Sequence, residues 1–379
     1  MSGTEREAGP EAGAPLAHCA AQAARVLERT FELAQIPAPP FDEGDRVARV
    51  ADWWHTDGLE VERQPVGNLW ARLREGTDPG RGAVVVAAHL DTVFGREVRH
   101  GLRREAGRVV GPGCGDDTVA VAALSALDSL LPSRTAAPVW VLATVGEEGL
   151  GDLAGARAAL AHLPEPVETF VALEGNYLGR VNVVGVGSVR KRVRISGRGG
   201  HAWEDAAAPS AVHIAAAMVQ AIAQLPEPAG VRSSRNVGLL RGGESINSRA
   251  IHASFDVDLR AEDPAALAAL GAAVDEIVAR RHEGVDVEVE PLGNRPAGRI
   301  DPDHALVRTA VDALAEVGIT ARLTAASTDA NVAYAAGIPA VTLGITYGDG
   351  THTEEEWIDP DAIRLGLHAL ARTITERSA

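Results

Sequence analysis

Acidic and imidazole side chains come directly after short apolar runs of this sequence. His89 and Asp91 follow one run, Glu147 and Glu148 follow the next across a single glycine, and Glu174 ends a third. Each feature alone is more often an ordinary polar turn or a helix cap. Their repeated placement after apolar runs instead favours a single site that all of them build.

Two more segments carry acidic or imidazole side chains. Asp116 and Asp117 close the glycine-rich stretch GPGCGDD, and His352 lies in the loop after a fourth apolar run. In open α/β sheets, ligands bind beyond the carboxyl ends of the strands. So many acids and imidazoles at one edge would repel one another unless a cation lay among them. The sequence therefore predicts a metal cluster.

The ligand types narrow the choice of metal. Two imidazoles and three carboxylates suit Zn²⁺, with Co²⁺ or Mn²⁺ as substitutes, better than Ca²⁺ or a thiolate-bound metal. Five protein ligands with one shared carboxylate can hold two ions about 3.5–4 Å apart. These ligands are expected among the acids and imidazoles named above.

Two acidic residues of the same motifs are left for other roles. Asp91, two residues after a ligand, is expected to fix the ring of His89. Glu147, next to the ligand Glu148, is expected to take a proton from metal-bound water.

The apolar runs that precede these groups indicate strands buried on both faces, and helical patterns separate them. This alternation predicts an α/β fold with a mostly parallel sheet and helices on both faces. The expected strands are 83–88, 139–145, 170–173 and 340–345, and the expected helices are 16–33, 42–54, 118–131, 152–162 and 305–317.

A different order of elements occupies the middle of the chain. Its patterns read strand, helix, strand, strand, helix, strand, which is typical of a ferredoxin-like α+β unit. We therefore predict an inserted lid or dimerisation domain over 187–297, and a zinc-binding catalytic domain formed by 1–186 and 298–379.

The bulk properties exclude several classes of partner. The formal net charge of −16 would repel nucleic acid and anionic membrane surfaces. No apolar stretch is long enough to span a bilayer, and two cysteines make no disulfide framework. Residues 1–15 are polar and rich in Pro and Gly, so we expect a flexible tail without a signal peptide and a cytoplasmic protein.

Nine motifs make the chain similar to a known family, the dinuclear zinc exopeptidases and N-deacylases. That family includes carboxypeptidase G, acetylornithine deacetylase, succinyl-diaminopimelate desuccinylase and peptidase T. The motifs occur in family order over nearly the whole chain. They are HLDTVF from His89, GPGCGDD from Gly111, GEEGLGDLAG from Gly146, ALEG from Ala172, GRGGHAW from Gly197, GGESINSRA from Gly242, DLR from Asp258, STDAN from Ser327 and GTHTEEEW from Gly350.

The resemblance implies how the ligands are shared between two ions. Asp116 bridges both ions, His89 and Glu174 complete one, and Glu148 and His352 complete the other. It also implies that Glu147 activates the bridging water as general base and then protonates the leaving nitrogen.

The resemblance further implies a homodimer that forms through the inserted domain. His201 of that domain then reaches the active site of the partner subunit and helps to hold the oxyanion. Asn247 and Arg260 match family positions that contact substrate, and an Arg fork is a natural partner for a substrate carboxylate.

These observations predict a zinc-dependent hydrolase of amide bonds, a carboxypeptidase or an N-acyl-amino-acid amidohydrolase, that acts on a small peptide or N-acyl amino acid. One alternative is a di- or tripeptide aminopeptidase of the peptidase T type, whose substrate amine would need Asp117 or Glu244. Two clues disagree on this choice: Asp117 after the bridging Asp resembles the peptidase T branch, whereas Glu174 matches the carboxypeptidases and deacylases. The other alternative is a non-catalytic metal-binding interaction protein.

One pair of polar residues stays open between two interpretations. Asp329 and Asn331, in the motif STDAN, either belong to the site or simply cap the helix that follows them.

Overall fold

A computed structural model describes residues 16–379, so the predicted tail of residues 1–15 lies outside the described part. The chain divides into two compact units. Unit 1 comprises the described residues up to Val183 together with Ile300–Thr324 and Thr328–Ala379, and unit 2 comprises Val184–Arg299 and Ala325–Ser327. The insertion expected over 187–297 falls inside unit 2; the roles of the two units in zinc binding and dimerisation remain predictions.

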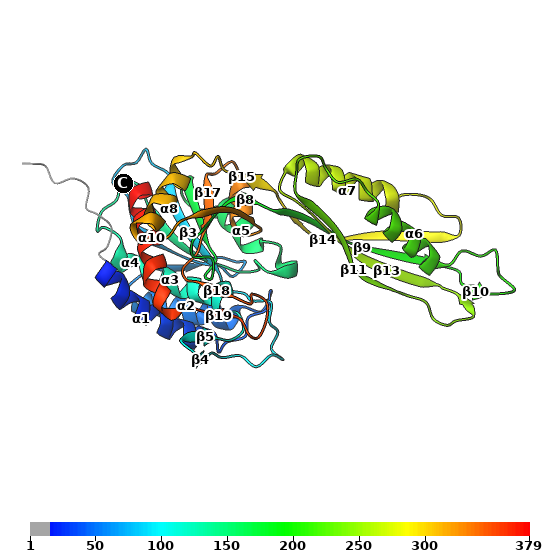
Figure 1. Cartoon of the computed structure of the whole chain (residues 1–379), viewed down its shortest axis with the longest axis horizontal. Helices are drawn as coiled ribbons and strands as arrows, with labels where there is room; N and C mark the ends of the chain where they lie inside the picture. Colours follow the sequence, from blue (N-terminus) through cyan, green and yellow to red (C-terminus); the bar gives the residue numbers. More distant parts are fainter. Residues whose placement is uncertain (1–15) are drawn as a thin grey trace, which may run out of the picture. The chain divides into compact units, whose positions relative to one another are not determined.

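Four apolar strands form the centre of the sheet of unit 1 (Figure 1). They are β6 (Val139–Thr144), β3 (Ala83–His89), β7 (Val167–Leu173) and β17 (Ala340–Leu343), and adjacent members of this series run parallel. Every residue of β3, β6 and β17 is buried, as expected for strands that helices cover on both faces. The four predicted strands are therefore present, with ends that differ by a few residues.

The flanks of this sheet are antiparallel. Within the described residues the sheet has nine strands, in the order β1-β2-β6-β3-β7-β17-β8-β15, with β16 paired to β8. The flanking strands, which the sequence patterns did not predict, are β1 (Val61–Arg63), β2 (Leu69–Arg74), β8 (Arg180–Gly185), β15 (Gly298–Arg299) and β16 (Arg322–Ala326). The parallel arrangement thus belongs to the centre of the sheet, where the candidate ligands follow the strands.

Helices cover both faces of the central strands. On one face, α5 (Ala154–His162) and α9 (Ala330–Ala335) share a hydrophobic core with alternate residues of β3, Ala83, Val85 and Ala87. On the other, α3 (Val119–Leu124) and α10 (Ile363–Ser378) contact β3. The remaining long helices are α1 (Leu16–Leu33) and α8 (Ala305–Glu316), which pack on α10, and α2 (Gly44–Thr56), which packs beside β1 and β2. The predicted α/β class is confirmed.

One predicted helix, 118–131, is wrong as a continuous element. It is divided into α3 and α4 (Leu127–Leu130), and the irregular turn η1 (Cys114–Thr118) precedes it. The division occurs because Ser125 and Ala126 donate their N–H groups three residues back, to Ala122 and Ala123, and so tighten the last turn of α3.

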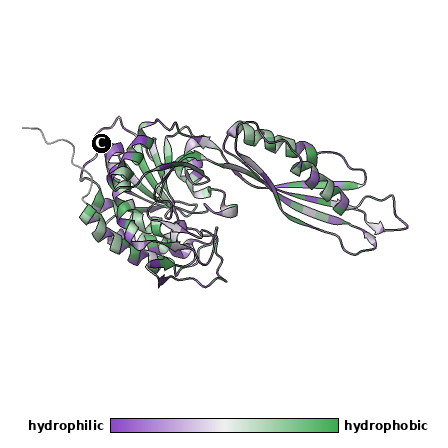
Figure 2. Ribbon diagram, viewed as in Figure 1, coloured by the Kyte–Doolittle hydropathy of each residue, from purple (hydrophilic) through white to green (hydrophobic). Residues whose placement is uncertain are grey.

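Unit 2 has the predicted ferredoxin-like order. Its elements are β9 (Gly187–Gly197), α6 (Ala211–Ala223), β11 (Ser233–Gly242), β13 (His252–Ala261), α7 (Pro264–Val278) and β14 (Val285–Arg295). The four strands form an antiparallel sheet in the order β11-β13-β9-β14. Alternate residues such as Val193, Ile195, Phe255 and Val257 share one core with the two helices, and hydrophilic and hydrophobic colours alternate along the strands (Figure 2).

Two small sheets carry predicted site residues. In unit 2, β10 (Gly200–His201) pairs with β12 (Ser248–Arg249). In unit 1, a four-stranded sheet has the order β18-β19-β5-β4 and contains β18 (Gly348–Asp349), β19 (Trp357–Ile358), β5 (Arg108–Val110) and β4 (Arg103–Glu105). This second sheet holds the loop of His352, between β18 and β19, beside the start of the glycine-rich turn that follows β5.

The structure also bears on membranes and disulfides. Among residues 16–379, no helix combines the length and the apolar character needed to cross a membrane. Cys19 and Cys114 are both buried, and among the described residues neither forms a disulfide.

Candidate metal centre and active site

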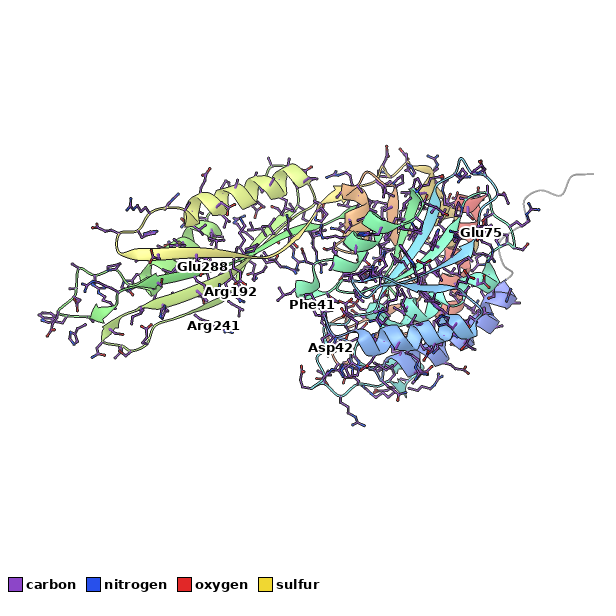
Figure 3. The ribbon with its side chains drawn as sticks, turned by 180° about the vertical axis from the view of Figure 1, so that it is seen from behind. Phe41, Asp42, Glu75, Arg192, Arg241 and Glu288 are labelled. Atoms are coloured by element: carbon purple, nitrogen blue, oxygen red, sulfur yellow. The ribbon has the colours of Figure 1, made fainter. Side chains whose placement is uncertain are left out.

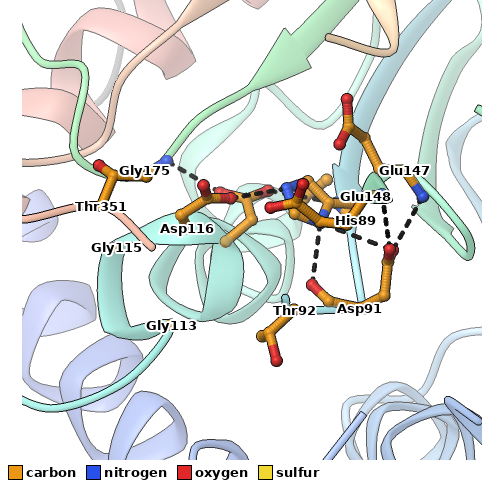
Figure 4. A network of polar contacts seen from close by, with 12 residues as sticks. His89, Asp91, Thr92, Gly113, Gly115, Asp116, Glu147, Glu148, Gly175 and Thr351 are labelled. Atoms are coloured by element: carbon orange, nitrogen blue, oxygen red, sulfur yellow. Dashed lines mark hydrogen bonds and ion pairs between the residues drawn. The ribbon is translucent and has the colours of Figure 1, made fainter. Parts of the chain in front are cut away.

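The predicted ligands meet beyond the carboxyl ends of the central strands, and Figure 4 labels three of them, His89, Asp116 and Glu148. His89 is the last residue of β3, and Glu148 and Glu174 lie in the segments that follow β6 and β7. Three groups of side chains have ligand atoms within 4.8 Å of one another. They are His89 with Glu147 and Glu148, His89 with Asp117 and Glu174, and Asp116 with Glu148 and His352.

Asp116 lies between the two histidines. Its Oδ1 is 3.0 Å from Nε2 of His89, and its Oδ2 is 3.1 Å from Nε2 of His352. The same nitrogen of His352 lies 3.0 Å from Oε1 of Glu148. One carboxylate therefore contacts both imidazoles, one with each oxygen.

The surroundings of His89 fit a bound divalent cation. Its Nδ1 lies 3.0 Å from the backbone oxygen of Asp91, so an N–H at Nδ1 donates to that oxygen. In the neutral ring, Nε2 then presents a lone pair to Oδ1 of Asp116, and neither of these buried atoms has a hydrogen-bond partner. Two facing lone pairs repel each other, and a cation that both atoms can ligate removes the conflict.

The charges of the cluster act strongly on one another. Burial disfavours an imidazolium, but the carboxylates of Asp116, Asp91 and Asp117 together outweigh it and hold the pKa of His89 well above its usual range. Contacts with Asp116 and Glu148 raise the pKa of His352 to about 10. Burial raises the pKa of Glu174 well above its usual range, and the charge of Asp116 adds to that effect. Protons on these groups balance a concentration of negative charge that a divalent cation can balance instead.

Asp91 connects the segments after β3 and β6. Its carboxylate accepts the backbone N–H of Glu147 at 3.0 Å and that of Glu148 at 2.7 Å, and one of its oxygens lies 3.6 Å from Nδ1 of His89 (Figure 4). The shortest contact to the His89 ring comes from the Asp91 backbone oxygen instead of the carboxylate. Asp91 thus holds Glu147 as well as the histidine ring for which it was predicted.

Two further carboxylates, neither predicted for this purpose, hold the backbone of the ligand segments. Asp117 accepts the N–H of His89 at 3.2 Å and of Gly175 at 2.8 Å. Glu356 accepts the N–H groups of Gly113, Gly115 and Asp116 at 3.0, 2.9 and 2.8 Å. Burial and the charge of Asp116 raise the pKa of Glu356 to about 8. The sequence contains three consecutive glutamates at this point, and only burial distinguishes Glu356 from its exposed neighbours.

A buried arginine supports the same segments from α2. The Arg46 guanidinium donates to the backbone oxygen of Leu90 at 3.0 Å and to Oγ1 of Thr118 at 3.2 Å. Leu90 lies between His89 and Asp91, so Arg46 joins the segment after β3 to the start of α3. No pattern in the sequence distinguishes this arginine from an ordinary residue of an amphipathic helix.

Two of the remaining predicted site residues lie together in unit 2. His201 is on β10 and Asn247 directly precedes its paired strand β12; the N–H of Ala202 donates to the backbone oxygen of Asn247 at 2.9 Å. Nδ1 of His201 lies 3.3 Å from the N–H nitrogen of Trp203 and 3.4 Å from that of Glu204, which both donate to it. Both predicted residues are exposed.

Arg260 lines a cavity of its own. Its Nε and Nη2 donate to the carboxylate of Asp258, at 2.9 and 3.3 Å. The polar side chains that line a cavity of about 300 Å³ beside it are a second arginine, three serines and one glutamate: Arg232, Ser233, Ser234, Ser327 and Glu262. All of these residues belong to unit 2.

The structure decides between the two interpretations of Asp329 and Asn331 in the motif STDAN. Asp329 makes no side-chain hydrogen bond that caps the helix after it, α9. Its Oδ2 accepts a hydrogen bond from Thr144 at the end of β6, at 2.6 Å. Asn331 accepts the N–H of Thr328 at 3.1 Å. Asp329 therefore joins its loop to the end of β6, and Asn331 holds the backbone of Thr328 in the same loop.

Two curated relatives and one solved structure show what this chain is similar to. It is 29% identical over 267 residues to a probable carboxypeptidase of Aspergillus clavatus, a match that covers 63% of this chain and 58% of the relative. It is also 29% identical over 234 residues to an acetylornithine deacetylase of Vibrio campbellii, which covers 55% of this chain and 59% of the relative. The chain therefore spans less than two thirds of the length of either relative.

The fold is that of a solved structure, the aminopeptidase PepT from Bacillus cereus. The two share 22% identity with a TM-score of 0.76, over 94% of this chain and 99% of that one. At this identity the likeness shows the fold alone. The model of peptidase family M20/M25/M40 matches residues 85–376, which include all five predicted metal ligands. The family predicted from the motifs is confirmed, and the chain belongs to peptidase family M20/M25/M40.

Proposed function

We propose that the protein is a metallohydrolase that cleaves amide bonds with two Zn²⁺ ions, as a carboxypeptidase or an N-acyl-amino-acid amidohydrolase. The observation that carries the proposal is the position of Asp116 between His89 and His352, at the same sheet edge as Glu147 and Glu148. Family membership and the two relatives support it.

Five side chains are proposed to hold the ions. His89 and Glu174 serve one, Glu148 and His352 serve the other, and Asp116 serves both. Co²⁺ and Mn²⁺ suit the same donors. When bound, the ions polarise the scissile carbonyl and offset the negative charge that develops on its oxygen.

Glu147 is proposed as the general base. It takes a proton from the water whose oxygen attacks the carbonyl carbon, and it gives that proton to the nitrogen that leaves when the C–N bond breaks. Its position supports this role: the side chain is 4% exposed, and Asp91 fixes the backbone of both Glu147 and Glu148. A metal-binding protein without catalysis would gain nothing from Glu147 in this place.

His201 is proposed to donate a hydrogen bond to the oxyanion. Since its Nδ1 accepts two backbone N–H groups, the proton of the neutral ring belongs on Nε2, which is then a donor. A preformed donor is what a developing oxyanion requires. We propose that it acts in the site of a partner subunit, within a homodimer formed through unit 2, in the cytoplasm.

Arg260 is proposed to bind the carboxylate of a small peptide or N-acyl amino acid, with Asn247 as a further contact. The cavity beside Arg260 supports this assignment, because a second arginine and three serine hydroxyls line it as donors for an anion, together with one carboxylate, Glu262.

The aminopeptidase alternative needs an acid for the substrate amine. Both carboxylate oxygens of Asp117 accept backbone N–H groups, and those of Glu244 accept the N–H of Ile251 and His252. Because the carboxylate oxygens of both acids already accept hydrogen bonds from the backbone, they are poorer partners for a substrate amine. This favours the carboxypeptidase or deacylase activity over the aminopeptidase.

The test is hydrolysis by the zinc-loaded protein of three matched substrates: a free dipeptide, its N-acetylated form and its C-terminal amide. We expect cleavage to tolerate the acetyl group and to require the free carboxylate. Cleavage that requires a free amine would establish the aminopeptidase instead, and no cleavage of any of the three would contradict the proposal.

A further inference from the structure

Three exposed apolar side chains lie on segments that adjoin the active site of unit 1. Val93 is two residues after Asp91 and is 39% exposed, and Leu150 is two residues after Glu148 and is 58% exposed. Phe41, on the loop before α2, is 74% exposed. Single exposed apolar residues are common on proteins, so the question is whether these three belong together.

The loop of Phe41 touches both of the other segments. The backbone oxygen of Ala38 accepts the N–H of Thr92, the neighbour of Val93, at 2.8 Å. Oε1 of Glu43 accepts the N–H of Phe41 and the N–H of Gly146, each at 3.0 Å. Phe41 and the residue that precedes Glu147 are thus held by one carboxylate oxygen.

The conformation of Phe41 gives a second, independent observation. Its φ is +74°, in the left-handed region that a residue with a Cβ atom rarely adopts and that glycine adopts readily. The phenyl ring gains little from packing, because most of it is exposed (Figure 3 labels it on its loop). A strained backbone that presents an unpacked aromatic ring is typical of functional sites.

We propose that Phe41, together with Val93 and Leu150, forms an apolar rim that binds an apolar side chain beside the scissile amide, so that the enzyme prefers substrates with large apolar residues there. This inference rests on the proposed function and adds the class of substrate. The ring is desolvated when substrate binds, and Glu43 fixes the backbone of Phe41 to that of Gly146, the residue before Glu147.

The test compares two substrates and two variants. Phe41→Gly removes the ring and accepts the positive φ without strain, so it separates a role in binding from a role in the fold. Leu323→Ala is the matched control, since Leu323 is a comparable exposed apolar residue at 45% on β16. The substrates are Gly–Gly and Leu–Leu, in whichever of the three forms above the wild-type protein cleaves.

For Phe41→Gly we expect kcat/KM for Leu–Leu to fall about tenfold while kcat/KM for Gly–Gly and the Tm stay near wild type. The Leu323→Ala variant should keep the wild-type ratio of the two substrates. If Phe41→Gly leaves the ratio of kcat/KM for Leu–Leu to that for Gly–Gly unchanged, with or without an equal loss on both substrates, the proposed rim is overturned.

If the wild-type protein cleaves neither substrate, the proposed function fails and the rim is judged by binding. Calorimetric titration of the zinc-loaded protein with the two dipeptides should then show tighter binding of Leu–Leu, and Phe41→Gly should abolish that difference. Equal affinity of the wild-type protein for the two dipeptides would reject the rim.

Discussion

Two regions hold their polar groups in different ways. The ligand edge of unit 1 is the set of segments after β3, β6 and β7 that carry His89, Glu148 and Glu174. The ribbon of unit 2 is the strand pair β10 and β12, which carries His201. At the ligand edge, buried carboxylates such as Asp91, Asp117 and Glu356 fix backbone N–H groups from segments far apart in the chain. On the ribbon, His201 is exposed, and its ring accepts N–H groups from residues two and three positions later.

This difference suits the two proposed tasks. Groups that hold two cations must keep their positions against mutual repulsion, which takes a shell of fixed partners. A histidine proposed to serve another subunit needs to stay accessible, and a local turn is enough to set its tautomer. Substitutions of the buried partners at the ligand edge should therefore lower both activity and stability, whereas substitutions on the ribbon should lower activity alone.

The largest effect is expected from Glu147→Ala, at the ligand edge. Turnover should fall by about 10³-fold or more, because the proton of the attacking water then has no acceptor. Zinc per chain, measured by plasma emission, should remain as in the wild-type protein. Retained activity would remove Glu147 from the role of base, and lost zinc would make it a ligand.

A smaller loss of turnover, about 10²-fold, is expected from His201→Ala on the ribbon, through one lost oxyanion donor. Its Tm should match that of the wild-type protein, because the side chain is exposed and its contacts are local. Mixing inactive Glu147→Ala with His201→Ala should restore part of the activity if His201 serves the partner subunit. No recovery, in a mixture shown to exchange subunits, would place His201 in its own subunit's site or outside catalysis.

The smallest effect is expected in the pH dependence of the metal-free protein. The pKa of Glu356 is raised from 4.5 to about 8, and that of His352 from 6.5 to about 10, so the folded protein binds these protons more tightly than the unfolded chain. The free energy of unfolding should therefore fall as pH rises from about 4.5 to about 8, by about 1–3 kcal/mol, and His352 extends the fall above that range.

Thermal unfolding of the chelator-treated protein across this pH range measures the effect. Glu356→Gln should flatten the lower part of the curve, whereas a substitution on the ribbon, His201→Ala, should leave it unchanged. A free energy of unfolding that rises with pH in the metal-free protein would contradict the origin assigned to these pKa shifts.

Much of the fold followed from local patterns. Fully apolar runs predicted the four central strands, because a strand covered on both faces has no polar side to show. The helix 118–131 failed because its interruption depends on hydrogen bonds at Ser125 and Ala126 and not on hydrophobic periodicity. The flanking strands β1, β15 and β16 were missed since short, partly exposed strands leave a weak pattern. The flanking strands β2 and β8 were missed because arginine or asparagine residues interrupt their apolar runs.

The sequence by itself determined the five candidate ligands, the candidate base Glu147 and the family, because each group directly follows a recognisable strand or lies in a motif of fixed spacing. Only the tertiary structure decided what holds them. Glu356 reaches the glycine-rich turn from the far end of the chain, Arg46 joins two ligand segments from α2, and Glu43 ties Phe41 to the segment of the base. These partners are backbone amides and carbonyls, which every residue carries, so residue types alone cannot reveal the pairings.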